Sequence, residues 1–334
     1  MRRLRSRVSS GQRITLRDLY LARARIAPWI RRTPLVASPS LSALGLARVF
    51  LKLETAQDTG AFKLRGATNF IRASVSTVRA PGVVTVSTGN HGRAVAHAAR
   101  CVGARAIVCM SKLVPGYKRA AIEALGAEIR IVGQSQDEAE VEAQRLVAEE
   151  KFTLIHPFDD PLVIAGQGTV GIEILEDQPE IDTVIVGLSG GGLISGIALA
   201  VKAANPHARV VGVTMDRGAA MYESVQAGHP VEVEEKPSLA DSLGGGIGLD
   251  NRFTFDLTRA LVDDYVLVTE SEIARAMRHL YWNERVIAEG GGAVSVAAVL
   301  AEKIPDLSGN VVCVVSGGNI DMTAFTRIVT EANR

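Results

Sequence analysis

Short runs rich in Val and Ile alternate with helix-like stretches along almost the whole chain, and this alternation limits the fold more than any other feature. Continuous apolar runs are typical of strands that are buried on both faces of a parallel sheet. The repeated order of strand and helix indicates an α/β fold. The strands are predicted at residues 49–53, 83–87, 106–110, 129–132, 183–186, 210–213, 266–269 and 311–316, and helices at 91–102, 118–124, 137–151 and 272–286.

Composition excludes several classes of protein. Of the 334 residues 47% are hydrophobic, which is enough to form one large or two ordinary domains. The formal net charge is only +1, so the basic excess of a nucleic-acid binder is missing. No apolar stretch reaches the roughly 18 residues of a membrane helix, and no signal-peptide core follows the basic residues 1–7. We therefore expect a cytoplasmic protein without a membrane partner.

The cysteines and the turns refine this expectation. Cys101, Cys109 and Cys313 are widely spaced in apolar surroundings, which predicts core residues in a reducing compartment.

A compact block of strand and helix units ends at the turn-rich segment 157–161. We predict a small inserted α/β domain at residues 81–157, and a large domain formed by residues 1–80 and 158–334.

A glycine-rich turn follows the predicted strand 183–186 and precedes a helix. Its residues Ser189, Gly190, Gly191 and Gly192 let the backbone turn tightly and direct several N–H groups to one point. The start of the helix adds partial positive charge, so the turn predicts a phosphate site rather than a plain connection. The ending of a P-loop is missing. Glycine spacing close to that of a dinucleotide turn leaves a nicotinamide-dependent dehydrogenase open as an alternative.

Two further strands end in polar, glycine-bearing segments. These are 87–91, which reads Ser87, Thr88, Gly89, Asn90 and His91, and 316–319, which begins with Ser316. Helix capping explains one polar residue in such a segment but not four in a row. Since ligands of open α/β sheets bind at the carboxyl ends of strands, the three segments predict one shared cleft.

Lys63 is the candidate nucleophile. It stands between Phe62 and Leu64, and apolar neighbours would desolvate the amine and lower its pKa. Taken alone, a solvated surface lysine is the commoner explanation. A lysine nucleophile together with a phosphate site suggests pyridoxal 5'-phosphate, whose aldehyde condenses with lysine.

These motifs together resemble the threonine dehydratase and serine racemase family, in family order from about residue 14 to residue 324. The resemblance implies pyridoxal phosphate as the cofactor, bound by the large domain. It also implies the tryptophan-synthase-β-like fold, called fold type II, with two open, twisted, mostly parallel sheets and flanking helices.

The resemblance assigns a role to each motif residue. It implies that Lys63 attaches the cofactor and later removes the α-proton of the substrate. Asn90 would bind the phenolic oxygen, Ser316 would face the pyridine nitrogen, and Phe62 and Glu289 would lie near the ring. The residues implied for the phosphate are Ser189, Gly190, Gly191, Gly192 and Leu193, and those for the substrate carboxylate are Ser87, Thr88, Gly89, Asn90 and His91.

The implied reaction is β-elimination of water from a β-hydroxy α-amino acid, which yields a 2-oxo acid and ammonia. The chain departs from the family pattern at several positions. Ala61 replaces a serine beside Lys63, and Thr88 replaces the second acid/base of racemases, which weighs against racemisation. Thr214 and Ala220 stand where eukaryotic-type racemases have metal-binding carboxylates, so we expect no divalent metal there.

Segments 242–249 and 289–293 resemble the branch called hydroxyectoine utilisation dehydratases. The closed hydroxyectoine ring has no primary amine for the cofactor. The implied substrate is therefore ring-opened 3-hydroxy-2,4-diaminobutyrate or an acylated form. An amino-acid racemase, a diamino-acid ammonia-lyase, a non-catalytic amino-acid sensor and the dehydrogenase remain as alternatives. We expect a small amino-acid substrate and a homodimer.

Overall fold

The computed structural model describes residues 14–330 except 88, 113, 115 and 135. Its larger sheet has six strands, all parallel except that the edge strand β1 runs antiparallel to β2. In spatial order they are β1 (Leu35–Ala37), β2 (Leu46–Leu53), β10 (Ser308–Val315), β7 (Thr183–Gly187), β8 (Arg209–Met215) and β9 (Asp264–Val268).

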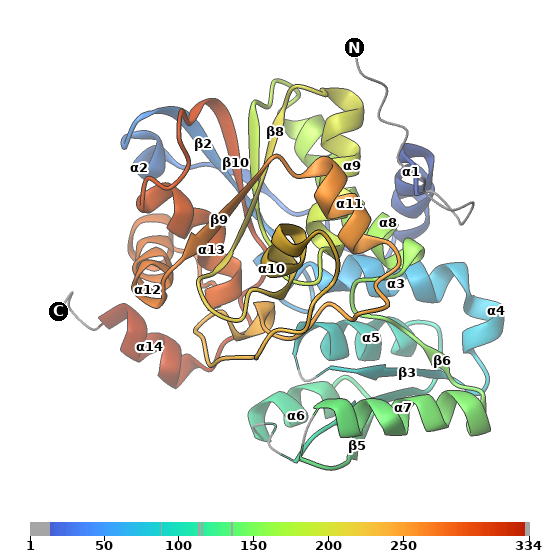
Figure 1. The fold of residues 1–334 in the computed structure, drawn as a ribbon. Helices are drawn as coiled ribbons and strands as arrows, with labels where there is room; N and C mark the ends of the chain where they lie inside the picture. Colours follow the sequence, from blue (N-terminus) through green and yellow to red (C-terminus); the bar gives the residue numbers. More distant parts are fainter. Residues whose placement is uncertain (1–13, 88, 113, 115, 135, 331–334) are drawn as a thin grey trace.

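The smaller sheet has four parallel strands from one continuous part of the chain (Figure 1). Their spatial order is β5 (Glu128–Ile131), β4 (Ala106–Met110), β3 (Val83–Val86) and β6 (Thr153–Leu154). All four lie within the insertion predicted at residues 81–157, while the domain boundaries themselves stay a prediction.

Helices cover both faces of the larger sheet because its strands are apolar on both faces. Along β10, Val311, Cys313 and Val315 belong to one buried cluster, whereas Val312 and Val314 belong to another on the opposite face. The first cluster is completed by α2 (Pro39–Ser42), α12 (Glu270–His279), α13 (Gly290–Leu300) and α14 (Met322–Thr330). The second is completed chiefly by α8 (Pro161–Asp177), α9 (Gly192–Ala204), α10 (Ala220–Ala227) and α11 (Thr254–Leu261), with α1 (Leu16–Ile26) packed outside α8.

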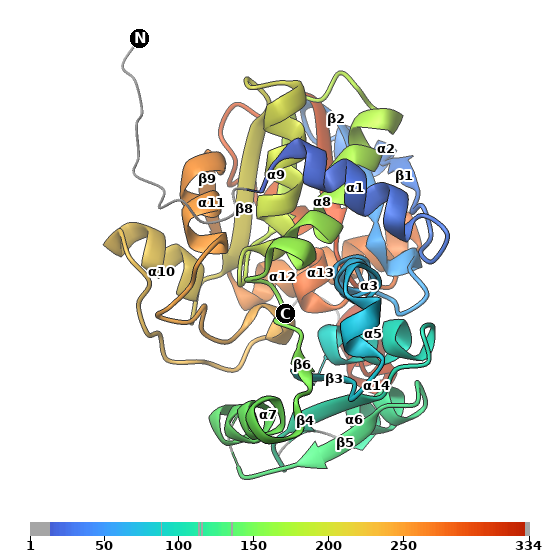
Figure 2. The same ribbon diagram turned by 90° about the vertical axis from the view of Figure 1, so that its right-hand side faces the viewer.

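Helix α3 (Lys63–Ala73) joins the two sheets. It packs against α8 on one side and against α5 (Asn90–Arg100), which covers the smaller sheet, on the other (Figure 2). The opposite face of that sheet is covered by α7 (Gln136–Glu150). The remaining helical segments are α4 (Val75–Val78), α6 (Gly116–Glu123), η1 (Glu54–Ala56), η2 (Asp241–Leu243) and η3 (Leu280–Glu284).

A fully buried ion cluster anchors α3 to its neighbours. The Arg65 guanidinium donates to both oxygens of Glu54 and both oxygens of Glu173, at 2.7–2.8 Å. Lys52 Nζ donates to Glu173 Oε2 at 2.7 Å. Burial alone would raise the pKa of Glu173, but Arg65 and Lys52 outweigh it and lower that pKa to about 2. Two acids and two bases therefore balance their charges away from water and connect β2, η1, α3 and α8.

The α/β class is confirmed, and each predicted strand is present with ends shifted by at most a few residues. The helix predicted at 272–286 is interrupted, because α12 ends at His279 and continues as the π-helical turn η3. The prediction of three core cysteines is wrong for Cys101, which is exposed.

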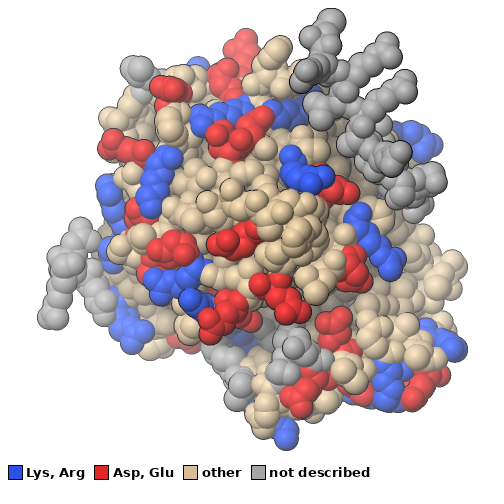
Figure 3. All heavy atoms as spheres, viewed as in Figure 1, with Lys and Arg blue, Asp and Glu red and all other residues tan. Residues whose placement is uncertain are grey.

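Two surface properties bear on possible partners. None of the described helices combines the length and the apolar character that a bilayer crossing requires. On the face that Figure 3 shows, basic and acidic side chains are interspersed, without a broad field of either sign.

Candidate active site

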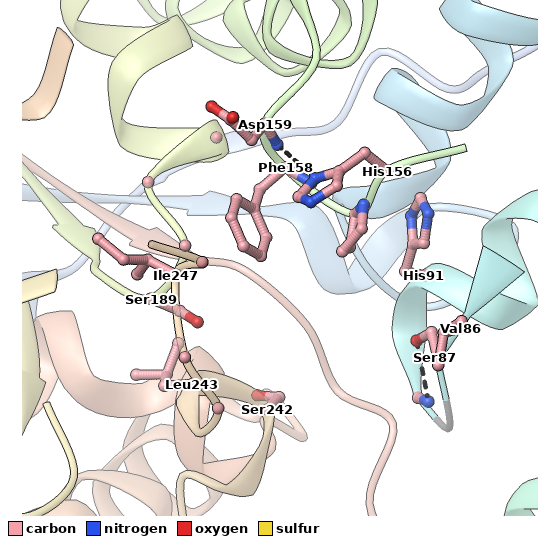
Figure 4. Close-up of a pocket in the computed structure, with 18 of the residues that line it drawn as sticks. Val86, Ser87, His91, His156, Phe158, Asp159, Ser189, Ser242, Leu243 and Ile247 are labelled. Atoms are coloured by element: carbon pink, nitrogen blue, oxygen red, sulfur yellow. Dashed lines mark hydrogen bonds between the residues drawn. The ribbon is translucent and has the colours of Figure 1, made fainter. Parts of the chain in front are cut away.

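A cavity of about 890 Å³ lies where the two sheets meet. Its wall includes the segments that follow β3, β6, β7 and β10, so the three polar strand ends predicted to share a cleft do so. Figure 4 shows side chains from the segments after β3, β6 and β7 around the cavity, among them Ser87, His91, His156 and Ser189.

Lys63 is the first residue of α3 and lines this cavity. Its position is fixed because the backbone N–H of Phe62 donates to Ser316 O at 3.0 Å, and Ala61 forms a β-bridge with Gly317. Lys63 Nζ donates to Pro157 O at 2.7 Å and lies 5.3 Å from the centre of the Phe62 ring. Burial lowers the pKa of Lys63 to about 8, which makes the amine a usable base near neutral pH.

The glycine-rich turn connects β7 to α9. Gly191 has a φ of +85°, a conformation that favours glycine, and a side chain on Gly190 would lie 2.3 Å from the Phe158 ring. The backbone N–H groups of Ser189, Gly190 and Gly191 donate to no described residue. The turn therefore presents free donors at a helix start, which is the arrangement that holds a phosphate.

Asn90, the first residue of α5, joins the smaller sheet to the loop after β10. Its Nδ2 donates to Glu289 Oε1 at 2.6 Å, and its Oδ1 accepts from Asn319 Nδ2 at 2.7 Å. Glu289 precedes α13 and is buried. Burial raises the pKa of Glu289 to about 7, although the Asn90 hydrogen bond opposes the shift.

The remaining predicted residues have simpler environments. Ser316 is buried, and its hydroxyl donates weakly to Gly291 O at 3.4 Å. The hydroxyl of Ser87 accepts the N–H of Gly89, also at 3.4 Å. Thr88 lies outside the described residues. Leu193, in the first turn of α9, completes the set of predicted residues that line the cavity.

His91 does not cap a helix, because it lies inside α5. Its Nε2 donates to Ile155 O at 3.1 Å, since the carbonyl can only accept. Burial and the nearby Lys63 lower the pKa of His91 to about 3, so this imidazole is neutral.

Sequence reasoning missed the segment 155–160 as a wall of the cavity. His156, Pro157 and Phe158 all line it, and Pro157 provides the acceptor for Lys63. The other three segments were identified because each follows a predicted strand, but the two-residue strand β6 was not predicted, so that signal was missing here.

Comparison with known proteins identifies the family of the chain. The model of the family described as "Pyridoxal-phosphate dependent enzyme" matches residues 26–317. The chain belongs to this family. Within it, a Sinorhizobium fredii protein named provisionally as a threonine dehydratase is 56% identical over 321 residues, covering 96% of this chain and 97% of that protein.

Two further relatives place the chain more closely within the pyridoxal-phosphate-dependent enzymes. The catabolic L-threonine dehydratase TdcB of Staphylococcus aureus is 39% identical over 320 residues, covering 95% of this chain and 92% of that protein. The solved structure of maize serine racemase has a TM-score of 0.89 at 37% identity, covering 94% and 96% of the two chains. The chain is therefore a pyridoxal-phosphate-dependent lyase of the threonine dehydratase and serine racemase group, with fold type II.

The residues around the cavity fit pyridoxal phosphate. A lysine of lowered pKa, a turn with free N–H groups at a helix start and a buried serine all face a single cavity. The family match gives no support to a nicotinamide enzyme. The described residues include no group of three or more His, Cys, Asp or Glu arranged to hold a metal. The expectation of no divalent metal near Thr214 and Ala220 stays a prediction.

Proposed function

We propose that this enzyme removes water from a β-hydroxy α-amino acid and releases a 2-oxo acid and ammonia. The observation that carries the proposal is the partly desolvated Lys63 amine beside the free N–H groups of the glycine-rich turn, in one cavity. The names of the threonine dehydratase relatives support the same reaction. Bound pyridoxal phosphate would supply the electron sink that the elimination requires.

We assign the holding of the cofactor to residues from four segments. Lys63 would attach it, with Phe62 beside its ring, and Asn90 and Ser316 would donate to its polar edges. Residues 189–193 would receive its phosphate, and Glu289 would orient Asn90 through the hydrogen bond at 2.6 Å.

Residues of the same cavity would also bind the substrate and remove its α-proton. The segment 87–91 would bind the substrate carboxylate through backbone N–H groups and hydroxyls. Lys63 Nζ would take the α-proton, which a neutral amine of pKa about 8 does readily near that pH. The water lost in the elimination returns when the released product hydrolyses, so the net products are the 2-oxo acid and ammonia.

For the substrate itself we propose ring-opened 3-hydroxy-2,4-diaminobutyrate or an acylated form, with threonine and serine as simpler alternatives. Acidic side chains line the cavity wall, and they complement the second ammonium group of the ring-opened compound. They are Glu232, Glu235 and Asp250, with Asp241 beside them but paired with Lys118 at 2.8 Å.

Absorption spectra of the purified protein and of two lysine variants test the proposal. We expect a near-visible band from the lysine-bound cofactor in the wild type and its loss in Lys63→Ala. The matched control is Lys118→Ala, because Lys118 is the other lysine on the cavity wall, and this variant should keep the band.

Ammonia release from β-hydroxy amino acids then tests the reaction. Lys63→Ala should lose release by on the order of a thousandfold, because its anchor and base are absent. A colourless wild type after addition of pyridoxal phosphate would contradict the proposal. Interconversion of serine enantiomers without ammonia release would identify a racemase instead, and release from 2,3-diaminopropionate alone a diamino-acid ammonia-lyase.

A further inference from the structure

Residues 156–160, which we call the strap, return the chain from β6 to α8 across the cavity. The strap has no helix or strand of its own. Nevertheless each of its residues has a defined partner. Those of His156 lie within the strap, and those of the other residues also come from other parts of the molecule.

Three strap residues contact the cavity wall or the segment beside it. Pro157 O accepts the Lys63 amine at 2.7 Å. The Phe158 ring packs against the glycine-rich turn, since a Cβ on Gly190 would lie 2.3 Å from it. The Asp159 carboxylate accepts the backbone N–H groups of residues 252, 253 and 254 at 2.7–2.9 Å, at the start of α11.

His156 holds the strap in this shape from within. Its Nδ1 accepts the backbone N–H of Asp159 at 2.7 Å, which Figure 4 shows, and the N–H of Phe158 at 3.3 Å. An atom that accepts two N–H groups carries no proton, so this imidazole is neutral with its proton on Nε2. The ring also lies edge-on against Phe158, with 4.6 Å between ring centres.

The hydrogen bonds of His156 resemble those of an Asx-turn. Asn and Asp side chains commonly accept backbone N–H groups two or three residues further along and so fold the chain locally. His156 does the same with a ring nitrogen. Within the strap, its two hydrogen bonds and the ring contact hold the turn together with the backbone bond from Asp160 N–H to Phe158 O at 3.1 Å, while Asp159 attaches the turn to the start of α11.

We propose that His156 is a positioning residue for Lys63, because it folds the strap so that Pro157 O meets the amine and Phe158 closes over the glycine-rich turn. This proposal rests on the proposed function, because it concerns how the amine of Lys63, the base assigned there, is positioned and shielded from water. Pro157 O is the one described acceptor for Lys63 Nζ, and the strap is part of what shields that amine from water. Opening the strap would therefore hydrate Lys63.

The test compares His156→Ala with His156→Asn, and it reads Lys63 directly in cofactor-free protein. Trace acetylation with acetic anhydride over a pH series, followed by mass spectrometry, gives the pH midpoint of Lys63 reactivity. We expect a midpoint of about 8 in the wild type. It should rise by more than one pH unit in His156→Ala, because the hydrated amine returns toward its ordinary pKa. His156→Asn should restore the midpoint, since its side-chain oxygen accepts the same two N–H groups.

Two results would overturn the proposal. One is a His156→Ala midpoint equal to that of the wild type. The other is a His156→Asn midpoint displaced as far as that of His156→Ala, which would make Nε2–H or ring packing the important feature.

If His156→Ala does not fold, His156→Gln takes its place, because the longer side chain is close to histidine in size but misplaces the acceptor. A wild-type midpoint in that variant would also overturn the proposal. The readout needs no bound cofactor. If the role of His156 is wrong but the proposed function is right, the wild type still shows the near-visible band. If the proposed function is wrong, the wild type lacks that band.

Discussion

At the scale of single residues, the candidate site depends on groups whose ionisation the fold has changed. Lys63 and Glu289 both line the cavity, and burial favours the neutral form of each. A neutral amine can accept a proton, and a protonated carboxyl can donate a hydrogen bond. The cavity therefore holds a base and an acid that both titrate near neutral pH.

Glu289 gives a testable dependence of stability on pH. Its pKa in the folded protein is about 7, above the ordinary value of 4.5. The contribution of the protonated carboxyl is therefore complete below about pH 4.5, and it is lost as the pH rises from about 4.5 to about 7, where the unfolded chain has ionised and the folded chain has not. Glu289→Gln cannot ionise. From about pH 5 to about pH 8, the unfolding free energy of the wild type should therefore fall by roughly 2–3 kcal/mol more than that of Glu289→Gln.

Urea unfolding of the two cofactor-free proteins at both pH values measures this difference. A difference between variant and wild type that stays constant with pH would show that Glu289 does not change its ionisation in this range.

The sequence predicted the site residues that occur in patterns, and missed those that depend on local backbone geometry. The glycine-rich turn could be found because its residues already indicate free N–H groups, and Lys63 could be found because it occurs together with that turn, although its apolar neighbours alone do not distinguish it from a surface lysine. His156 could not be found in this way. Its role is to accept N–H groups two and three residues away, which is visible only when the turn itself is known.

At the scale of elements, helix starts determine how the chain enters the region around the cavity. Asp160 precedes α8 and accepts the N–H groups of Leu162 and Val163 at 2.8 and 3.0 Å, and Pro161 occupies the first helical position. This is the preferred start of a helix. The turn-rich patch that marked a predicted domain end is thus the cap of α8.

Asp160→Ala should lower the unfolding free energy by about 1 kcal/mol, because two N–H groups lose their acceptor. Asp160→Ser is the matched control, since serine also caps helices, and it should retain most of the stability. Thermal or urea unfolding of the three proteins measures the effect. Equal losses in the two variants would mean that the contribution of Asp160 is not that of a cap.

Strands were the elements most easily predicted, because runs such as 106–110 are apolar at every position and buried on both faces. The edge strand β1 was not expected, since three residues with two of them exposed carry no apolar pattern. The π-helical turn η3 was missed because the apolar residues around it continue at helical spacing.

At the scale of the whole molecule, α3 and its ion cluster hold the region that carries Lys63 against the larger sheet. Glu173 shares hydrogen bonds with Arg65 and Lys52, both fully buried. Sequence could not predict these pairs, because Glu173 is 108 residues from Arg65 and 121 from Lys52 along the chain.

Glu173→Ala should lower the unfolding free energy by about 3–5 kcal/mol, because it leaves two buried cations without one of their partners. Glu176→Ala on the same helix is the control. Glu176 pairs with Arg23 and Arg32 while 43% of its side chain is exposed, so its loss should cost about 1 kcal/mol or less.

Chemical unfolding of both variants in cofactor-free form gives the comparison. Similar losses from the two substitutions would show that burial adds nothing to the cost of breaking the cluster.

The ion cluster also limits how this sequence can drift over evolutionary time. Each of Lys52, Glu54, Arg65 and Glu173 neutralises charge on another member, and all four are closed to water. A single substitution that removes the charge of any one of them leaves a buried partner without part of its counter-charge, in a place that solvent does not reach. Descendants of this protein can therefore change these positions only by concerted replacement.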